Sequence, residues 1–372
     1  MRILHIIPGF GGGISSFVKN IALGNNNCNI TNDVIGFNTF PDEYKHLIAN
    51  QGGKTYTLPS VHKSFIQMTK EYTQILRDGD YDVVHCHFSG YKSLPFKFIA
   101  RKQNIKRIVT HAHRTSEEKL MLFSGIHSKI EGYFSRALST DLLACSTMAG
   151  MYIFGKSTRK VIVIPNSVDT EKFMETVSDV TLRKYRQEFQ IDDDCYVIGH
   201  IGRFNLQKNH RFIIRIAKTL KGRDFKFKIL LIGDGELFNQ ISEEISRQKL
   251  EDCFVLMGKR KDVSQLLKLF DVMILPSLFE GLPTVAVEAQ AAGVSCLLAD
   301  TITLECDMHM GNVKYLPLKS ELQWCDEIMR IGCNHVAQDM IRDQLEKMGF
   351  TLNAMQEKYL NVFSLERGTD EK

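Results

Sequence analysis

The sequence has no long apolar run, no paired-cysteine motif and no block of like charges. None of its apolar stretches reaches the ~18 residues that a membrane-spanning helix needs. The nine cysteines are scattered, odd in number and never spaced C-x-x-C, which excludes an obvious disulfide framework or cysteine-based zinc site. The formal net charge is only +4 and basic residues are spread along the chain, so nucleic acid is not an implied partner.

The amino-terminal end and the composition indicate an ordinary globular protein. The opening MRILHIIPGF runs into glycines without the small-residue cleavage site of a signal peptide, so we expect a cytoplasmic protein. With 372 residues, of which 44% are hydrophobic and 24% charged, the chain is long enough for two domains of ordinary size.

Short apolar runs alternate with amphipathic helical stretches, and the rhythm restarts near residue 195. This alternation predicts an α/β fold with two doubly wound, Rossmann-like domains, each a parallel sheet covered by helices, facing a cleft. Predicted strands lie at 3–7, 33–37, 81–86, 107–111, 142–145 and 161–164, then at 196–202, 227–232, 254–257, 272–275 and 296–298.

The turn-like PNSVD and the polar stretch after it mark the predicted join between domains. We assign residues 1–166 to an amino-terminal acceptor-binding domain, 167–194 to a linker and interdomain segment, and 195–340 to a nucleotide-sugar-binding domain. A helical pattern runs from Val336 to Leu365, and we treat 341–372 as a carboxyl-terminal helix that could pack back on the first domain.

Ligands of parallel sheets bind at the carboxyl ends of the strands, so functional residues are expected just after each predicted strand. The first strand is followed by the glycine-rich turn Pro8–Ser15, in which Gly12 and Gly13 allow close approach of a ligand to a helix start. The spacing is not that of a dinucleotide-binding turn. The alternative is a tight structural turn.

Histidines follow two of the predicted strands. His111 and His113 lie two apart, as do His85 and His87, so each pair points to one face as metal ligands would. No H-x-x-E-H pattern accompanies them, and we do not predict a metal site. We assign His113 an active-site role in binding or polarising substrate, against the alternative of a core or capping histidine.

Two further loops carry candidate phosphate-binding residues. Arg203 and Lys208 follow the first strand of the second domain, where a guanidinium and an ammonium could clamp a diphosphate. The alternative is two solvated charges. Gly233 and Gly235 follow the next strand and are predicted to line the base and phosphate end of the same pocket.

The strongest signal is the segment from Glu280 to Gly293. Pro283 suits the first turn of a helix, which leaves the N–H groups of Thr284 and Val285 available to a phosphate. About one turn later Glu288 could accept two ribose hydroxyls, while Glu280 precedes the helix on the sugar side. The alternative is that both glutamates are ordinary surface carboxylates.

Together these segments resemble the retaining glycosyltransferases of the GT-B fold known as family 4, or glycosyl transferases group 1, over roughly residues 1 to 340. The overall pattern is most similar to bacterial enzymes of capsular and exopolysaccharide synthesis. The matching segments occur in the family's order: GGGIS, HAH, IPNSVD, GRFNLQKN, LLIGDGE, VLMGKRKDV and the glutamate pair within PSLFEGLPTVAVEAQAAG. One departure is Val294, where the family commonly has proline.

The resemblance implies a retaining transfer from a nucleotide diphosphate sugar, expected to be a UDP-sugar, to a glycan or lipid-linked acceptor, with no metal or other cofactor. His113 would lie near the C6 region of the sugar, and Met257 and Gly258 would edge the base. The implied catalytic residues are His113, Glu280, Arg203 and Lys208, and the implied donor-binding residues are Gly12, Gly13, Gly233, Gly235, Met257, Gly258, Leu282, Pro283, Thr284, Val285 and Glu288.

Other readings remain open at this point. A sugar-nucleotide epimerase or hydrolase would share the diphosphate site, and a non-catalytic partner could bind a nucleotide sugar without transferring it. The basic and aromatic residues between Ser93 and Arg107 are compatible with a peripheral contact with the inner face of the cell membrane. A solvated helix face explains them equally well.

Overall fold

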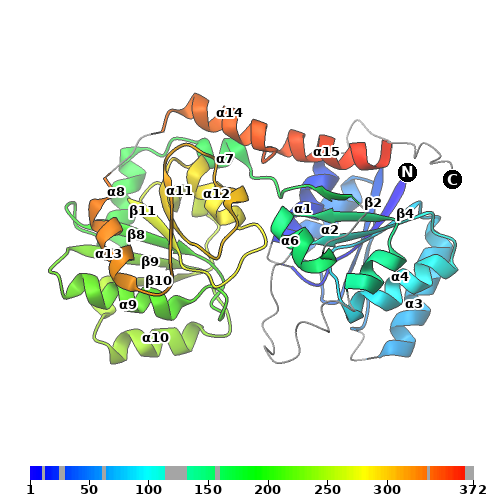
Figure 1. Ribbon diagram of the computed structural model, residues 1–372, viewed down its shortest axis with the longest axis horizontal. Helices are drawn as coiled ribbons and strands as arrows, with labels where there is room; N and C mark the ends of the chain where they lie inside the picture. Colours follow the sequence, from blue (N-terminus) through cyan, green and yellow to red (C-terminus); the bar gives the residue numbers. More distant parts are fainter. Residues whose placement is uncertain are drawn as a thin grey trace. The chain divides into compact units, whose positions relative to one another are not determined.

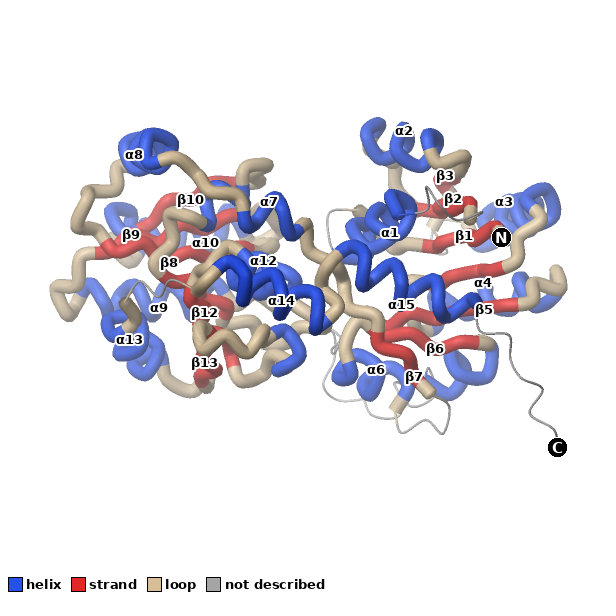
Figure 2. Tube along the Cα trace, turned by 90° about the horizontal axis from the view of Figure 1, so that it is seen from above, coloured by secondary structure: helices blue, strands red, loops and turns tan. Residues whose placement is uncertain are grey.

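The computed structural model describes residues 1–10, 13–24, 30–60, 64–113, 132–155, 160–332 and 336–364. The chain divides into two compact units, one formed by Met1–Ser167 with Leu352–Lys372 and the other by Val168–Thr351. Each unit is built around one parallel sheet with helices packed on it (Figures 1 and 2).

The sheet of the first unit has seven strands in the order β3-β2-β1-β4-β5-β6-β7, and every pair is parallel. Its strands are β1 (Arg2–Ile6), β2 (Thr31–Gly36), β3 (Thr55–Thr57), β4 (Val83–Cys86), β5 (Arg107–Ala112), β6 (Asp141–Ala144) and β7 (Val161–Val163). Its helices include α1 (Gly13–Leu23), α2 (Asp42–Asn50), α3 (Phe65–Gly79), α4 (Leu94–Lys102), α6 (Thr147–Phe154) and α15 (Leu352–Ser364).

Alternating residues of β1 show how this sheet forms two cores. Ile3 packs with Phe17 of α1 and Tyr359 of α15 in one buried cluster. The next residue, Leu4, packs in a second cluster with Tyr72 of α3 and other residues. Because successive strand side chains point to opposite faces, a strand covered by helices on both sides is buried on both faces, and most of its residues are apolar.

The sheet of the second unit has six parallel strands in the order β10-β9-β8-β11-β12-β13. Its strands are β8 (Tyr196–Ile201), β9 (Phe227–Ile232), β10 (Phe254–Gly258), β11 (Val272–Leu275), β12 (Ser295–Ala299) and β13 (Val313–Leu316). Its helices include α7 (Thr170–Met174), α8 (Asp179–Glu188), α9 (His210–Lys221), α10 (Phe238–Arg247), α11 (Val263–Leu267), α12 (Thr284–Ala291), α13 (Glu321–Arg330) and α14 (Gln338–Met348).

The predicted α/β fold with two doubly wound parallel sheets is confirmed. Two strands were missed, β3 and β13, and both lie at the edge of a sheet. Each is short, and β13 alternates half-buried, exposed and buried residues in place of a continuous apolar run. Edge strands are covered less completely, so their sequence signal is weaker.

Two segments, 167–194 and 336–365, differ from what was predicted from the sequence. Residues 167–194 contain α7 and α8, and from Val168 onward they belong to the second unit. The continuous helix expected over Val336–Leu365 is wrong, because Gly349 adopts a left-handed conformation (φ 77°) that ends α14. The following helix, α15, packs against α1, where Gln356 Nε2 donates to Asn20 O at 2.7 Å.

Among the described residues, no helix is long and apolar enough to span a membrane. The stretch from Ser93 to Arg107 is less basic at its surface than its sequence suggests. Lys97 is fully buried within α4, and Arg107 Nη2 pairs with Asp141 Oδ1 at 2.8 Å. Phe98 remains exposed beside Lys102, whose Nζ lies 4.8 Å from the ring centroid.

Candidate functional site

The loop between β8 and α9 carries a close ion pair. Lys208 Nζ lies 2.6 Å from Glu280 Oε1, and both side chains are largely buried, with 14% and 8% of their surface exposed. Lys208 lies two residues before the start of α9, whereas Glu280 follows β11, the strand next to β8 in the sheet. The topology therefore joins two residues that are 72 positions apart.

Neighbouring side chains hold this pair in place. Gln207 Nε2 donates to Glu280 Oε2 and to Phe279 O, both at 3.0 Å. Asn209, in a left-handed conformation at φ 54°, donates from Nδ2 to Pro276 O at 3.1 Å. These bonds tie the loop after β8 to the loop after β11, so that the Glu280 carboxylate is fixed from two sides.

In the second unit, glycines allow the loops that follow β8, β9 and β10 to pack directly on one another. A Cβ atom on Gly233 would lie 1.9 Å from Gly202 O, and one on Gly235 would lie 2.5 Å from Phe204 O. Gly233 N donates to the carbonyl of Gly258, which has φ 61° and ends β10 next to the half-buried Met257. Substitution at Gly233 would therefore separate the loops that line this end of the sheet.

Arg203 does not bond to the buried Lys208–Glu280 pair in this structure. Its Nη2 atom pairs with Glu236 Oε2 at 3.1 Å, and its side chain is 71% exposed. The structure therefore brings Lys208 and Glu280 together, while it connects Arg203 to the glutamate of the Gly233–Glu236 loop. An exposed ion pair of this kind is worth little energetically, so the guanidinium can exchange its partner at small cost.

Helix α12 begins at Thr284, and Pro283, which was predicted to suit the first turn, is the residue just before it. Ala286 N donates to Pro283 O at 2.9 Å, so the amides of Thr284 and Val285 precede the intrahelical bonds. Leu282 and Val285 are each 8% exposed and anchor this turn in the core. The helix start therefore offers N–H groups and a partial positive charge at the strand ends.

Glu288 lies in the second turn of α12, in surroundings that disfavour its charge. Burial raises the pKa of Glu288 to about 7, against the opposing effect of the Lys172 and Lys208 ammonium groups. The two lysines come from α7 and from the loop before α9. A carboxyl group whose pKa lies near 7 and that is close to two cations is a candidate hydrogen-bond acceptor for a polar ligand.

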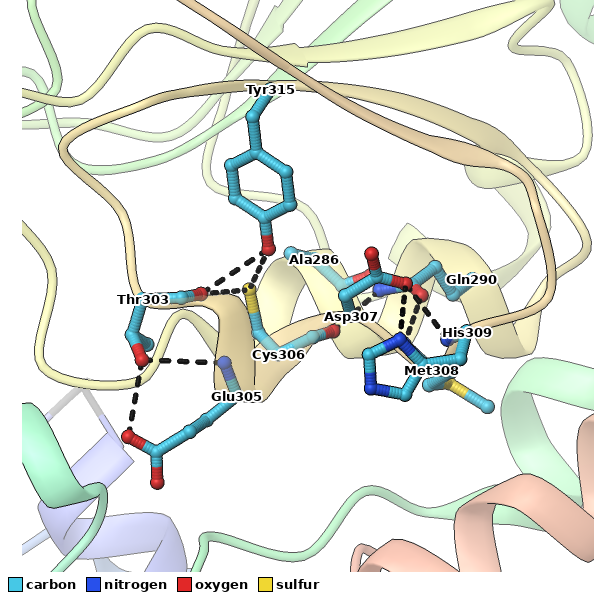
Figure 3. Close-up of polar contacts among 9 residues, drawn as sticks. All are labelled: Ala286, Gln290, Thr303, Glu305, Cys306, Asp307, Met308, His309 and Tyr315. Atoms are coloured by element: carbon cyan, nitrogen blue, oxygen red, sulfur yellow. Dashed lines mark hydrogen bonds and ion pairs between the residues drawn. The ribbon is translucent and has the colours of Figure 1, made fainter.

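The loop after β12 is fastened to α12 by the buried amide of Gln290 (Figure 3). Its Nε2 atom donates to Cys306 O at 2.7 Å and to Ala286 O at 2.9 Å, and its Oε1 atom accepts from Met308 N at 2.8 Å. On the other side of the same loop, Tyr315 donates to Thr303 O at 3.2 Å. Gln290 was not predicted as a site residue, although a glutamine on an otherwise apolar helix face indicates a buried hydrogen-bonding role.

In the first unit, the described part of the glycine-rich turn is Gly13, at the start of α1. A Cβ atom there would lie 2.7 Å from Nδ2 of Asn166, which is 6% exposed. The start of α1, after the β1 turn, thus packs closely on Asn166, near the start of the PNSVD segment. Gly12, the other predicted glycine, lies outside the described residues.

His113 follows β5 within a cluster of histidines that sequence analysis recognised only in part. The rings of His111 and His113 lie 4.0 Å apart, and so do those of His85 and His87. His113 is half-buried, and burial lowers its pKa to about 3. His5, on β1, was missed. It pairs with His85 in strand register, so knowledge of the strand order would have revealed it.

Two family models match the chain and together cover most of it. The model described as "Glycosyltransferase Family 4" matches residues 11–172. The model described as "Glycosyl transferases group 1" matches residues 182–308, the part that holds Lys208, Glu280 and Glu288. The chain belongs to the family 4 glycosyltransferases. The predicted family and the predicted transferase class are thereby confirmed.

Similar proteins of known sequence agree with this assignment. The glycosyltransferase is 29% identical to EpsF of Bacillus subtilis (strain 168), itself named as a glycosyltransferase, over 99% of this chain and 98% of EpsF. It is 28% identical to UDP-Gal:alpha-D-GlcNAc-diphosphoundecaprenol alpha-1,3-galactosyltransferase of Escherichia coli, over 64% of this chain and 62% of that protein.

Solved structures show the same fold at lower sequence identity. HepE of Anabaena, in complex with UDP-glucose, superposes with a TM-score of 0.80 at 16% identity, over 98% of this chain and all of HepE. At this identity the likeness supports the GT-B fold, whereas the assignment to a glycosyltransferase family comes from the family models and sequence relatives.

Proposed function

We propose that this glycosyltransferase moves a sugar from a UDP-sugar to a glycan or lipid-linked acceptor in bacterial surface polysaccharide synthesis, with retention of anomeric configuration and without a metal. The observation that carries the proposal is the Lys208–Glu280 pair near the start of α12, with Glu288 close enough to Lys208 to sense its charge. This group combines a cation for phosphate with carboxylates for hydroxyls.

The second unit supplies the proposed donor site. Lys208 and Arg203 would bind the diphosphate, helped by the amides of Thr284 and Val285. Glu288 would accept the ribose hydroxyls, and Glu280 the hydroxyls of the sugar. The carbonyl and amide groups near Gly233, Gly235 and Gly258 would lie beside the base and phosphates. Met257, Leu282 and Pro283 would line the same end of the site. UDP-glucose bound to HepE is consistent with a uridine nucleotide in this fold.

The proposed reaction needs no enzymic nucleophile. An acceptor hydroxyl attacks the anomeric carbon on the leaving-group face while the bond from that carbon to the diphosphate oxygen breaks. The hydroxyl proton passes to a phosphate oxygen. Lys208, Arg203 and the α12 amides would stabilise the negative charge that develops on the departing UDP, which is the task that a metal ion performs in other enzymes.

We assign the acceptor to the first unit, near Gly13, the predicted Gly12 and His113. The relatives favour a surface polysaccharide role, because the Escherichia coli relative acts on a diphosphoundecaprenol-linked sugar by its name. A peripheral contact with the inner face of the cell membrane would suit such an acceptor, with exposed Phe98 and its neighbour Lys102 as the candidate contact.

The decisive experiment is a transfer assay over a panel of UDP-, GDP- and ADP-sugars with undecaprenyl-diphosphate-linked acceptors, in which product configuration is read by NMR. We expect transfer from a UDP-sugar with retained configuration. Transfer only from another nucleotide would refute the donor assignment, and an inverted product would refute the retaining mechanism. Accumulation of free sugar or an epimer at the full turnover rate with donor alone would instead identify a hydrolase or epimerase.

A further inference from the structure

Among the described residues, five histidines gather at one end of the sheet in the first unit, on three neighbouring strands. Four of them are fully buried and the fifth is half-buried. They lie on or just after β1, β4 and β5: His5, His85, His87, His111 and His113. A buried imidazole nitrogen without a partner is costly, so the bonds that each ring makes or lacks indicate what the cluster can hold.

The pairing of β4 with β5 brings members of two histidine pairs together. Cys86 is paired with Thr110, so the residues that follow them, His87 and His111, are neighbours across the two strands. His113 comes two positions after His111 and points to the same face, with the two ring centroids 4.0 Å apart. The sequence shows two histidine pairs without a third metal ligand, and the order of the strands supplies one.

The three rings offer nitrogens at distances that suit a shared ion. His87, His111 and His113 each have a ring nitrogen, and these three atoms lie within 4.8 Å of one another. His87 Nδ1 lies 3.2 Å from His113 Nε2. Two nitrogens bound to one tetrahedral zinc ion at about 2.0–2.1 Å are roughly 3.3 Å apart, so this pair already has the required separation.

His111 is the ring of the three that has the fewest bonds to lose. Neither of its nitrogens has a hydrogen-bond partner among the described residues, although the backbone of Ala144 favours its charged form. The Nδ1 atom of His113 also lacks a partner among them. Phe17 of α1 packs edge-on against His111, with ring centroids 4.8 Å apart. An ion would therefore satisfy buried nitrogens that the described protein groups leave unpaired.

The rings are neutral, as metal-binding imidazoles must be. Burial lowers the pKa of His113 to about 3, and burial with repulsion from neighbouring rings holds the pKa values of His87 and His111 well below their usual range. A neutral imidazole keeps one lone pair for coordination.

His5 lies behind His87 in the position of a supporting group. His87 Nε2 is 2.9 Å from His5 Nδ1. A histidine that coordinates through Nδ1 carries its proton on Nε2, and His5 Nδ1 is placed to accept that proton in a hydrogen bond. Histidine ligands of metal sites are usually held by such a bond at their second nitrogen.

We propose that His87, His111 and His113 bind one divalent transition-metal ion of the zinc class, which cross-links the carboxyl ends of β4 and β5. Imidazole suits zinc, cobalt, nickel and copper, whereas magnesium and calcium prefer oxygen ligands. Three protein ligands leave a fourth position for water. Because His113 is half-buried, an ion can enter from its side.

This ion goes beyond the proposed function and plays no part in the proposed reaction. It lies within the first unit, whereas the groups assigned to the departing diphosphate belong to the second. Mg²⁺ and Mn²⁺, which suit oxygen ligands, would not replace it. Failure to bind zinc would leave the proposed donor site intact, and failure of sugar transfer would leave the metal site intact.

The site is tested by titrating the full chain with Co²⁺ and then with Zn²⁺, without a polyhistidine tag and after removal of metal by a chelator. We expect one equivalent of Co²⁺ to give the visible absorption of a four-coordinate site and one equivalent of Zn²⁺ to displace it. Tm should rise, because the ion binds the folded state. Absence of binding, or binding of several ions without a change in Tm, would overturn the proposal.

Glutamine variants identify the ligands. His111→Gln should weaken Zn²⁺ binding about 100-fold or more, because changes behind the ligands already weaken metal sites about 10- to 100-fold. His85→Gln removes a buried ring of the same cluster, and His46→Gln removes an exposed ring on α2, and both should bind Zn²⁺ like wild type. Binding that survives in His111→Gln, or that is lost in His46→Gln, would overturn the proposal. Binding lost in His85→Gln with an unchanged metal-free Tm would overturn this ligand set.

X-ray absorption at the zinc edge gives a test that needs no variant. In the wild-type complex we expect scattering from imidazole rings and a first shell of nitrogen and oxygen at about 2.0–2.1 Å. A first shell that contains sulfur, at about 2.3 Å, would show cysteine ligation and would overturn the assignment to the three histidines.

Discussion

The two units share a parallel α/β architecture but gather different chemistry at their strand ends. The second unit concentrates charge, with the buried Lys208–Glu280 pair and Glu288 near Lys172. The first unit concentrates neutral histidines whose pKa values are held below their usual range. A diphosphate requires compensating charge, whereas sugar hydroxyls require directed neutral donors and acceptors, so the difference fits a division of labour between the units.

The largest expected effect is on the charged site. Lys208→Ala should lower kcat/KM for the donor by about 10³-fold, because it removes a cation that stabilises the departing diphosphate and leaves Glu280 without its ion pair. Steady-state kinetics on folded protein measure this loss. The matched control is Lys221→Ala, which removes an exposed ion pair with Asp252 in the same unit. Equal activity in the two variants would remove Lys208 from the donor site.

A second prediction uses pH to tell the units apart. Glu288 ionises with a pKa of about 7, so affinity for the donor should fall as the pH is lowered through 7, where the carboxyl loses acceptor capacity. His5 and His113, with pKa values of about 4 and 3, contribute nothing in this range. Calorimetric binding of the donor between pH 5.5 and 8.5 gives the midpoint.

The Lys172 ammonium lowers the Glu288 pKa, so Lys172→Ala should move that midpoint upward. A midpoint that stays fixed in Lys172→Ala, or one that survives in Glu288→Gln, would show that another group titrates. Either result would weaken the assignment of the ribose to Glu288.

A third, smaller effect concerns stability. The folded-state pKa of Glu288 is raised above its ordinary value of 4.5, so between pH 4.5 and 7 the folded protein binds more protons than the unfolded chain. Its contribution therefore lowers stability as pH rises through that window. Glu288→Gln should then increase the unfolding free energy at pH 8 by about 1–2 kcal/mol, with partial exposure taken into account.

Thermal unfolding of Glu288→Gln and wild type at several pH values checks this expectation. The difference in Tm should be greatest at pH 8 and should narrow toward pH 5. A variant that is less stable than wild type at pH 8 would mean that the carboxylate has favourable partners in the folded state. Glu288 would then be a structural residue as well as a candidate ribose ligand.

The smallest expected effect is that of a chelator. Because fixed cations and helix amides are proposed to stabilise the leaving diphosphate, turnover in excess EDTA should equal turnover in its absence. Strict dependence on a divalent ion, restored by Mg²⁺ or Mn²⁺, would contradict the proposed division of labour. It would transfer part of the electrostatic task from Lys208 and Arg203 to the ion.

Local patterns predicted much of the fold because buried parallel strands are apolar on both faces. The strand over Phe227–Ile232 was predicted with its observed bounds, whereas the edge strand β13 was missed. The helix break at Gly349 was also missed, because a single glycine within a helical pattern does not by itself indicate a left-handed helix cap. Assignment to a family 4 glycosyltransferase rested on motif order, and the family models confirm it.

Some residues of the candidate site could be predicted from the sequence, and others could be found only in the structure. Glu280 and Lys208 could be chosen as candidates from their positions after strands, but nothing local says that they pair with each other at 2.6 Å. Gln207, Lys172 and Gln290 were not assigned, because their partners come from segments distant in the chain. The functional roles themselves stay predictions that the experiments above test.

The sequence by itself determined the two α/β sheets, the family and the glutamate segment, since strand periodicity, glycine placement and motif order are local properties. Only the tertiary structure decided what the histidines do together. His5, His87 and His113 are separated by tens of residues, and their hydrogen-bonded chain exists because β1, β4 and β5 lie side by side. No local pattern encodes contacts that depend on the order of the strands in the sheet.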